Sequence, residues 1–266
     1  MEPNTYNFRL IFINLISRYL LVLLRASINF EVLNSFLTFI PARGGSKSIP
    51  KKNIAILGSK PLIAYTLDVC NRIDDMPNTL ISTDDEEIAS YCSSEGYETD
   101  YRRPKNLSAD DSVMVDAVLH GVEWYEQNHN CRITDILILQ PTSPLRKLED
   151  VKSSVEHYIS NNIQSLVSVT YMKEHPSICV EQNIEGKNWE YLREPTKTNS
   201  QRQDFEGVFG FIDGSIYIVS QDFLREHNSI IVPGETELYF TNQRYAIDID
   251  EPEDLALAQL IVKSIE

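Results

Sequence analysis

The stretch Phe36–Asn53 reads FLTFIPARGGSKSIPKKN, and it decides how the rest of the chain is interpreted. It opens with a short apolar run that is typical of a buried strand. Gly44 and Gly45 follow, and glycines let a backbone pass close to a ligand and turn its N–H groups inward. Four basic residues lie within the ten positions 43–52: Arg43, Lys47, Lys51 and Lys52. Backbone donors and cations at a strand end predict a triphosphate site.

Two familiar phosphate-binding patterns are absent from this loop. It has neither the GxxxxGK[ST] pattern of a P-loop nor the GxGxxG pattern of a dinucleotide site. A solvated basic turn after an edge strand is the alternative that the residues alone leave open.

Apolar strands and amphipathic helices alternate after this loop, which predicts an α/β domain with a mostly parallel sheet covered by helices. The expected strands are 36–41, 78–85, 135–140, 165–172 and 214–220. The expected helices are 61–73, 85–97, 114–128, 148–161 and 251–265. Ligands of such sheets bind beyond the carboxyl ends of the strands. The loops expected there are 41–53, 82–87 and 140–146.

The second half of the chain is less regular. Residues 172–212 predict an inserted β-rich arm of the kind that carries an interface or a lid. Residues 237–250 predict a strand, a turn and a second strand. In that second strand Asp248 and Asp250 alternate, so both carboxylates would project from one face.

Composition narrows the function classes. The net charge is −15 over 266 residues, which opposes binding to nucleic acid or anionic lipid. The four cysteines have neither CxxC nor zinc-site spacing and predict a reduced, cytoplasmic protein.

Residues 1–36 form an N-terminal extension that is apolar over 10–24. This run is too short to span a bilayer and lacks the order of a signal peptide. An amphipathic helix, a membrane-surface anchor and upstream sequence outside the native protein all stay open, and we favour the last. The domain of interest is then 37–266.

Several strings from Phe36 onward resemble the acylneuraminate cytidylyltransferases, which activate sialic acid and its relatives. They are PARGGSKSIPKKN, KPLIAYTL, ISTDDEEIA, RRPKNLSADDS, QPTSPLR, RQD, GSIYI and AIDIDEPEDL, in the family's order. The resemblance implies a Rossmann-like nucleotide-sugar transferase fold with a small dimerisation arm. It also implies that CTP and a nine-carbon sugar acid are converted to the CMP-sugar and pyrophosphate by a homodimer.

The resemblance assigns roles to individual residues. Lys52 would balance charge as pyrophosphate leaves, Gln140 would orient the substrates, and Arg202 would face the sugar carboxylate. The nucleotide contacts would be Arg43, Lys47, Asn53, Arg103 and Ser112. Asp248 and Asp250 would hold Mg²⁺, which prefers oxygen ligands; the alternative is that Asp250 caps the following helix. For the acidic run 84–87 we expect only a capped helix start.

The match is weakest in the segments that the resemblance assigns to the sugar. Family members that act on N-acetylneuraminate often have a lysine shortly after the His-Pro pair, whereas this chain has Ser177 and Ile178 there. Asp213 stands where the family has asparagine. These departures favour legionaminic or pseudaminic acid as the acceptor. Other open alternatives are an eight-carbon sugar acid, a sugar 1-phosphate, or a non-catalytic membrane-associated relative.

Overall fold

The computed structural model describes residues 33–73, 78–182, 186–194 and 207–265. A six-stranded sheet forms its centre, in the order β10-β6-β9-β5-β1-β4. The strands are β1 Phe36–Pro41, β4 Thr79–Ser82, β5 Asp135–Ile138, β6 Ser165–Tyr171, β9 Gly210–Ser220 and β10 Glu237–Phe240.

Neighbouring strands are parallel except around β9. β1 pairs in parallel with β4 and β5, and Phe39 faces Leu80 on one side and Ile138 on the other. β10 is parallel to β6, whereas β9 runs antiparallel to both β5 and β6. The prediction of a mostly parallel sheet is confirmed. The parallel strands end at one edge, where β9 begins.

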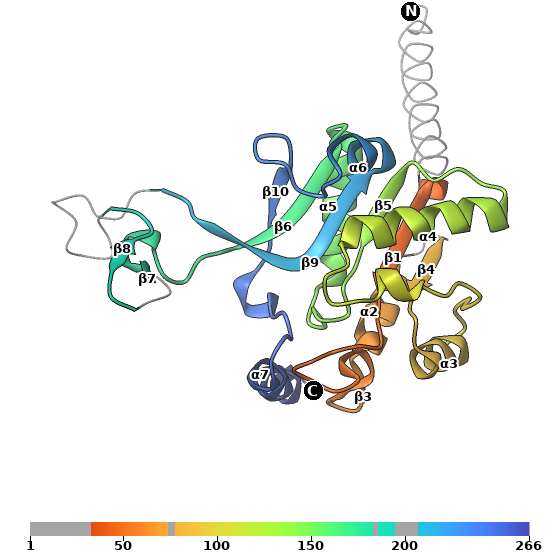
Figure 1. Cartoon of the computed structure of the whole chain (residues 1–266), viewed down its shortest axis with the longest axis horizontal. Coiled ribbons are helices and arrows are strands. Elements are labelled where there is room, and N and C mark those ends of the chain that lie inside the picture. Colours follow the sequence, from red (N-terminus) through yellow and green to blue (C-terminus); the bar gives the residue numbers. More distant parts are fainter. Residues whose placement is uncertain (1–32, 74–77, 183–185, 195–206, 266) are drawn as a thin grey trace, which may run out of the picture.

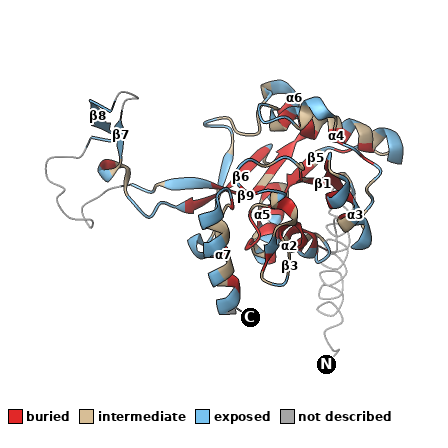
Figure 2. Cartoon of the chain, turned by 60° about the horizontal axis from the view of Figure 1, so that its bottom comes forward, coloured by how far each residue is buried: buried red, intermediate tan, exposed pale blue. Residues whose placement is uncertain are grey.

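Helices cover both faces of the sheet (Figure 1). They are α2 Leu62–Cys70, α3 Glu86–Ser94, α4 Met114–His129, α5 Leu148–Ser160, α6 Gln221–His227 and α7 Pro252–Ile265. Side chains alternate along β1: Leu37 and Phe39 pack with α4 and α6, whereas Phe36 packs with α2 and α5. The buried sheet thus holds the loops at its carboxyl edge in fixed positions (Figure 2).

α7 packs beside the loop that follows β1. Its Ala258 and Val262 contact Ile49 and Leu57, and Leu57 belongs to the short antiparallel pair β2 Ile56–Leu57 and β3 Lys60–Pro61. This cluster ties the C-terminal helix to the basic loop, although the two are far apart in the sequence.

The arm projects away from the body (Figure 1). It leaves at the end of β6, returns at the start of β9, and contains the antiparallel pair β7 Val180–Gln182 and β8 Trp189–Tyr191. Its side chains are largely exposed, including Trp189 at 58% and Val208 at 71%.

Two expectations for the second half need correction. Residues 246–250 are not a strand; instead Ile249 donates its backbone N–H to the Thr142 carbonyl at 2.8 Å. The short helix α6 was not anticipated. In the part of the chain that the structure describes, no helix combines the length and apolarity that crossing a membrane requires.

Candidate active site

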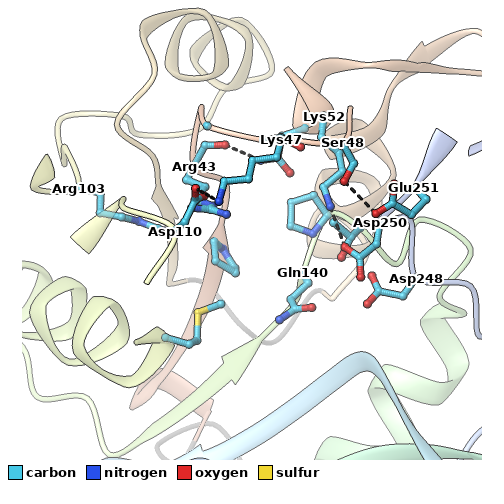
Figure 3. Close-up of a pocket in the computed structure, with 17 residues that line it drawn as sticks. Arg43, Lys47, Ser48, Lys52, Arg103, Asp110, Gln140, Asp248, Asp250 and Glu251 are labelled. Carbon is cyan, nitrogen blue, oxygen red and sulfur yellow. Dashed lines mark hydrogen bonds and ion pairs between the residues drawn. The ribbon is translucent and has the colours of Figure 1, made fainter. Parts of the chain in front are cut away.

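A cleft of about 530 Å³ lies at the carboxyl edge of the sheet. It brings together residues from loops that are far apart in the sequence (Figure 3). Its charged and polar lining includes Arg43, Lys47, Ser48, Lys52, Asn53, Arg103, Asp110, Gln140, Thr142, Asp248, Asp250 and Glu251. All the predicted site residues except Ser112 and Arg202 are among them.

The glycine-rich loop is anchored to the start of α3. Gly44 donates its N–H to Asp84 Oδ1 at 2.9 Å, and a Cβ at Gly44 would lie 2.7 Å from the Asp85 side chain. Asp85 caps α3 by accepting from Glu87 N and Ile88 N at 2.8 and 3.0 Å. The expectation of a capped helix start is confirmed. Asp84 and Asp85 additionally fix the loop.

Two of the predicted nucleotide-binding cations share one carboxylate. Asp110 pairs with Arg43 at 2.8 Å and with Lys47 at 2.7 Å. Hydrogen bonds from Lys47 and then Arg43 hold the pKa of Asp110 below its usual range. Asp110 therefore occupies the place between two cations where an anionic ligand would fit. Sequence reasoning missed it, although it lies in the string RRPKNLSADDS.

Lys52 reaches across the cleft. Its Nζ lies 2.8 Å from Asp250 Oδ1, and the lysine side chain is only 16% exposed. The next residue, Asn53, is buried and donates to the Arg43 carbonyl at 2.8 Å, which holds the two ends of the basic loop together. At the start of α7, Asp254 Oδ2 accepts from the N–H groups of Asp250 and Glu251, whereas the Asp250 carboxylate pairs with Lys52.

Arg103 is a buried cation in the cleft wall. It donates to the Ser82 hydroxyl at 2.9 Å and to the Ser82 carbonyl at 2.8 Å, at the end of β4. Burial lowers the pKa of Arg103. Among the described residues, no carboxylate lies at ion-pair distance from Arg103. A buried cation of this kind favours binding of an anion.

Asp248 lies opposite the basic loop, and its Oδ1 is buried without a hydrogen-bond partner among the described residues. Burial raises the pKa of this carboxyl, and the Asp250 charge adds to the rise, whereas a hydrogen bond from Thr142 opposes it. An orphaned carboxylate oxygen beside a second carboxylate fits a hard cation. Asp248 and Asp250 can thus hold Mg²⁺ together with phosphate oxygens. In the described residues they are not joined by a third metal-binding side chain.

Gln140 follows β5 and lies at the floor of the cleft (Figure 3). Gly214 of β9 lies beside it: a Cβ there would be 3.3 Å from Gln140 Oε1 and 3.4 Å from Asp248 Oδ2. The φ angle of Gly214 is 71°, which favours glycine. β9 therefore reaches the site at a residue that has no side chain.

Two predicted residues are not in the cleft lining. The Ser112 hydroxyl donates within its own loop and lies 2.6 Å from the Ala109 carbonyl. Arg202 lies outside the described residues. Of the residues expected on the sugar side, Asp213 and Ser177 are buried and Ile178 is exposed on the arm.

A smaller, more apolar pocket of about 310 Å³ adjoins the cleft. The two share Met114 and Gln140. Its other lining residues include Val113, Ile138, Tyr217, Ile230 and Ile231.

Comparison with known proteins agrees with this arrangement. Residues 37–232 match the cytidylyltransferase family. The chain belongs to this family. This cytidylyltransferase is 30% identical over 228 residues to CMP-N,N'-diacetyllegionaminic acid synthase of Legionella pneumophila, a match that covers 85% of this chain and 96% of the relative.

Other relatives are equally similar. Pseudaminic acid cytidylyltransferase of Campylobacter jejuni is 30% identical over 85% of this chain and 96% of its own. N-acylneuraminate cytidylyltransferase of Streptococcus agalactiae serotype V is 30% identical over 81% of this chain but only 50% of the relative. The cytidylyltransferase thus spans about half the length of the streptococcal proteins it matches.

The fold is that of a solved CMP-2-keto-3-deoxy-manno-octonic acid synthetase complexed with CTP. The two superpose with a TM-score of 0.64 at 15% identity, covering 87% of this chain and 99% of the other.

Proposed function

We propose that the cytidylyltransferase couples CTP to a sialic-acid-type nine-carbon sugar acid and releases pyrophosphate. The observation that carries the proposal is a cleft that brings four cations together with the carboxylates of Asp248 and Asp250. The cations are Arg43, Lys47, Lys52 and Arg103. This charge pattern suits a triphosphate and its metal, although the whole molecule has a net charge of −15.

In the proposed reaction the anomeric hydroxyl oxygen of the acid attacks the α-phosphorus of CTP. The new oxygen–phosphorus bond forms as the bond to the β-phosphate breaks, pyrophosphate leaves, and the hydroxyl proton passes to solvent. Lys52 and Arg43 offset the charge that develops on the phosphates, since preorganised cations contribute most in a partly desolvated site. Mg²⁺ held by Asp248 and Asp250 would supply Lewis-acid stabilisation of phosphate charge.

The acceptor is proposed to lie between Gln140 and the arm. The apolar pocket beside Gln140 suits acyl groups, such as those in the name of the Legionella relative's product. Arg202 is proposed to bind the acceptor carboxylate, for which a guanidinium fork is suited. The buried Asp213 side chain does not line the cleft, so its replacement of asparagine no longer argues for a particular acceptor.

We propose a cytoplasmic homodimer. All four cysteines are free thiols, which suits a reducing compartment. Exposed apolar side chains gather on the arm, where a second copy would cover them, including Tyr171, Trp189, Leu192, Val208 and Phe211.

The test is a panel of acceptors incubated with the full chain, CTP and Mg²⁺. Pyrophosphate release and the mass of the CMP-sugar are measured for N-acetylneuraminic, legionaminic and pseudaminic acids and for an eight-carbon acid. We expect CTP-dependent turnover with at least one nine-carbon acid. Turnover with the eight-carbon acid alone would replace the proposed acceptor, and lack of turnover with every acid would refute the activity.

A further inference from the structure

Arg146 is buried below the floor of the cleft and does not line it. Its guanidinium donates to three groups: the Gln140 carbonyl at 2.7 Å, the Thr66 hydroxyl at 3.2 Å and the Ser215 carbonyl. Burial lowers the pKa of Arg146 to about 10, and the charge of Asp213 is among those that oppose this. No carboxylate of the described residues lies within ion-pair distance of Arg146. It therefore spans β5 and β9 through neutral groups.

Asp213 is the buried counterpart on β9, at 1% exposure. Its carboxylate accepts from Ser215 N at 2.9 Å, from the Thr241 hydroxyl at 2.6 Å and from the Ser168 hydroxyl. Every one of these partners is a hydrogen-bond donor, so the carboxylate is satisfied in the interior without direct contact with a cation.

One peptide group joins the two charges. The peptide between Ser215 and Ile216 accepts from Arg146 at its oxygen and donates at 2.8 Å to the Ser168 hydroxyl at its nitrogen. Ser168 then donates to Asp213. Cation, peptide, hydroxyl and carboxylate thus form a relay in which each hydrogen bond polarises the next.

The relay surrounds the point where β9 touches the site. Asp213 and Ser215 flank Gly214, and the pairing of β9 with β6 shifts register between Val167 and Val169. Gly214 itself lies against Gln140 Oε1 and Asp248 Oδ2. The same guanidinium that holds Ser215 also holds the Gln140 backbone.

We propose that Arg146 and Asp213 are positioning residues for the transfer reaction: their relay fixes Gly214 and Gln140 relative to each other and to Asp248. Neither residue touches the proposed substrates. The inference rests on the proposed function, because it assigns the relay to the reacting end of that cleft rather than to CTP binding on the basic loop.

The test compares two substitutions of Asp213 with one control in the full chain. Asp213→Ala removes the acceptors, and we expect kcat to fall roughly 10- to 100-fold, as for a small misplacement of reacting groups, with KM for CTP within about threefold of wild type. Asp213→Asn keeps an acceptor for Ser168 and Ser215 N and should restore most of kcat. Asp222→Ala, an exposed change just beyond β9, should leave both constants unchanged.

A double variant tests the connection itself. Arg146→Met combined with Asp213→Ala should lose no more kcat than the more damaged single variant, because each change breaks the same relay. If Arg146→Met does not fold, Ser168→Ala replaces it in the cycle, since it removes the central hydroxyl without changing charge.

Two results would overturn the relay: folded Asp213→Ala with wild-type kcat, or a loss of kcat matched by an equal loss of CTP affinity. A wild-type chain that makes no CMP-sugar would refute the proposed function instead. The relay would then be judged by urea unfolding of the same variants, where strictly additive losses of stability would refute it.

Discussion

At the scale of single residues, the cleft's charged groups pair with one another across the place proposed for CTP. Lys52 contacts Asp250, and Asp110 contacts both Arg43 and Lys47. Asp110 and Asp250 are 45% and 68% exposed, and pairs with such exposure contribute little to stability. Phosphates and a metal ion can therefore replace these contacts without disturbing the fold.

The first prediction concerns Lys52, because the neighbouring Lys51 can serve as a matched control. Lys52→Gln should lower kcat roughly 100-fold, since removing one preorganised charge-stabilising group typically has that effect. Lys51→Gln should retain activity, because Lys51 pairs with Glu87 and does not line the cleft. Pyrophosphate release by the two variants checks this, and equal losses would show that only the loop's total charge matters.

Substitution of Asp248 by asparagine is predicted to raise stability and to lower activity. Its pKa is raised above 3.8, so between 3.8 and the raised value the native state binds more protons than the unfolded chain. The free energy of unfolding then falls as pH rises through that window. Without metal, Asp248→Asn should raise the melting temperature at neutral pH and flatten this pH dependence.

The same variant should need at least about tenfold more Mg²⁺ for half-maximal turnover, by analogy with lost metal-site groups. Thermal melts and a magnesium titration test the two halves. An unchanged magnesium requirement would exclude Asp248 as a ligand.

At the scale of elements, the sequence predicted where the strands and helices lie better than it predicted whether neighbouring strands run parallel or antiparallel. Apolar periodicity identified α2, α4 and α5, because each buries one face against the sheet. It could not reveal that β9 is antiparallel, since a period of two has no direction. Residues 246–250 alternate like a strand, yet Ile249 points into the α7 cluster and bonds to the Thr142 loop. The glycines and clustered cations identified the basic loop, but the role of Arg146 could be interpreted only from its carbonyl partners, one of which is distant in the sequence.

Gly214 and Gly234 provide a test of how β9 meets the site. Both have positive φ angles, 71° and 85°, but a Cβ at Gly234 would meet nothing within 4 Å. Alanine at either position should lower stability by about 1 kcal/mol, the left-handed penalty of a side chain. Gly214→Ala alone should also reduce turnover, because the new methyl group would press on Gln140 and Asp248. Urea unfolding and kcat are measured side by side, and equal activities would show that the contact is unimportant.

At the scale of the whole molecule, the exposed apolar side chains of the arm predict that it forms the interface of the proposed dimer. Trp189→Ser should convert the proposed dimer to a monomer, since it removes a large apolar side chain that is 58% exposed. Leu260→Ser is the control, because Leu260 is 67% exposed on α7 rather than on the arm. Light scattering after size exclusion measures both masses. A wild-type monomer, or dissociation in both variants, would contradict the assignment of the interface to the arm.

β9 also has a mechanical consequence. It starts at Gly210 beside the arm and reaches the floor of the cleft at Gly214, where its pairing with β6 shifts register. Residues 210–212 of β9 pair with residues 169–171 of β6, and only Asp213 separates this segment from Gly214, so a second copy that displaced the arm would also displace Gly214. We therefore expect a change in the arm that weakens the proposed dimer to lower turnover as well.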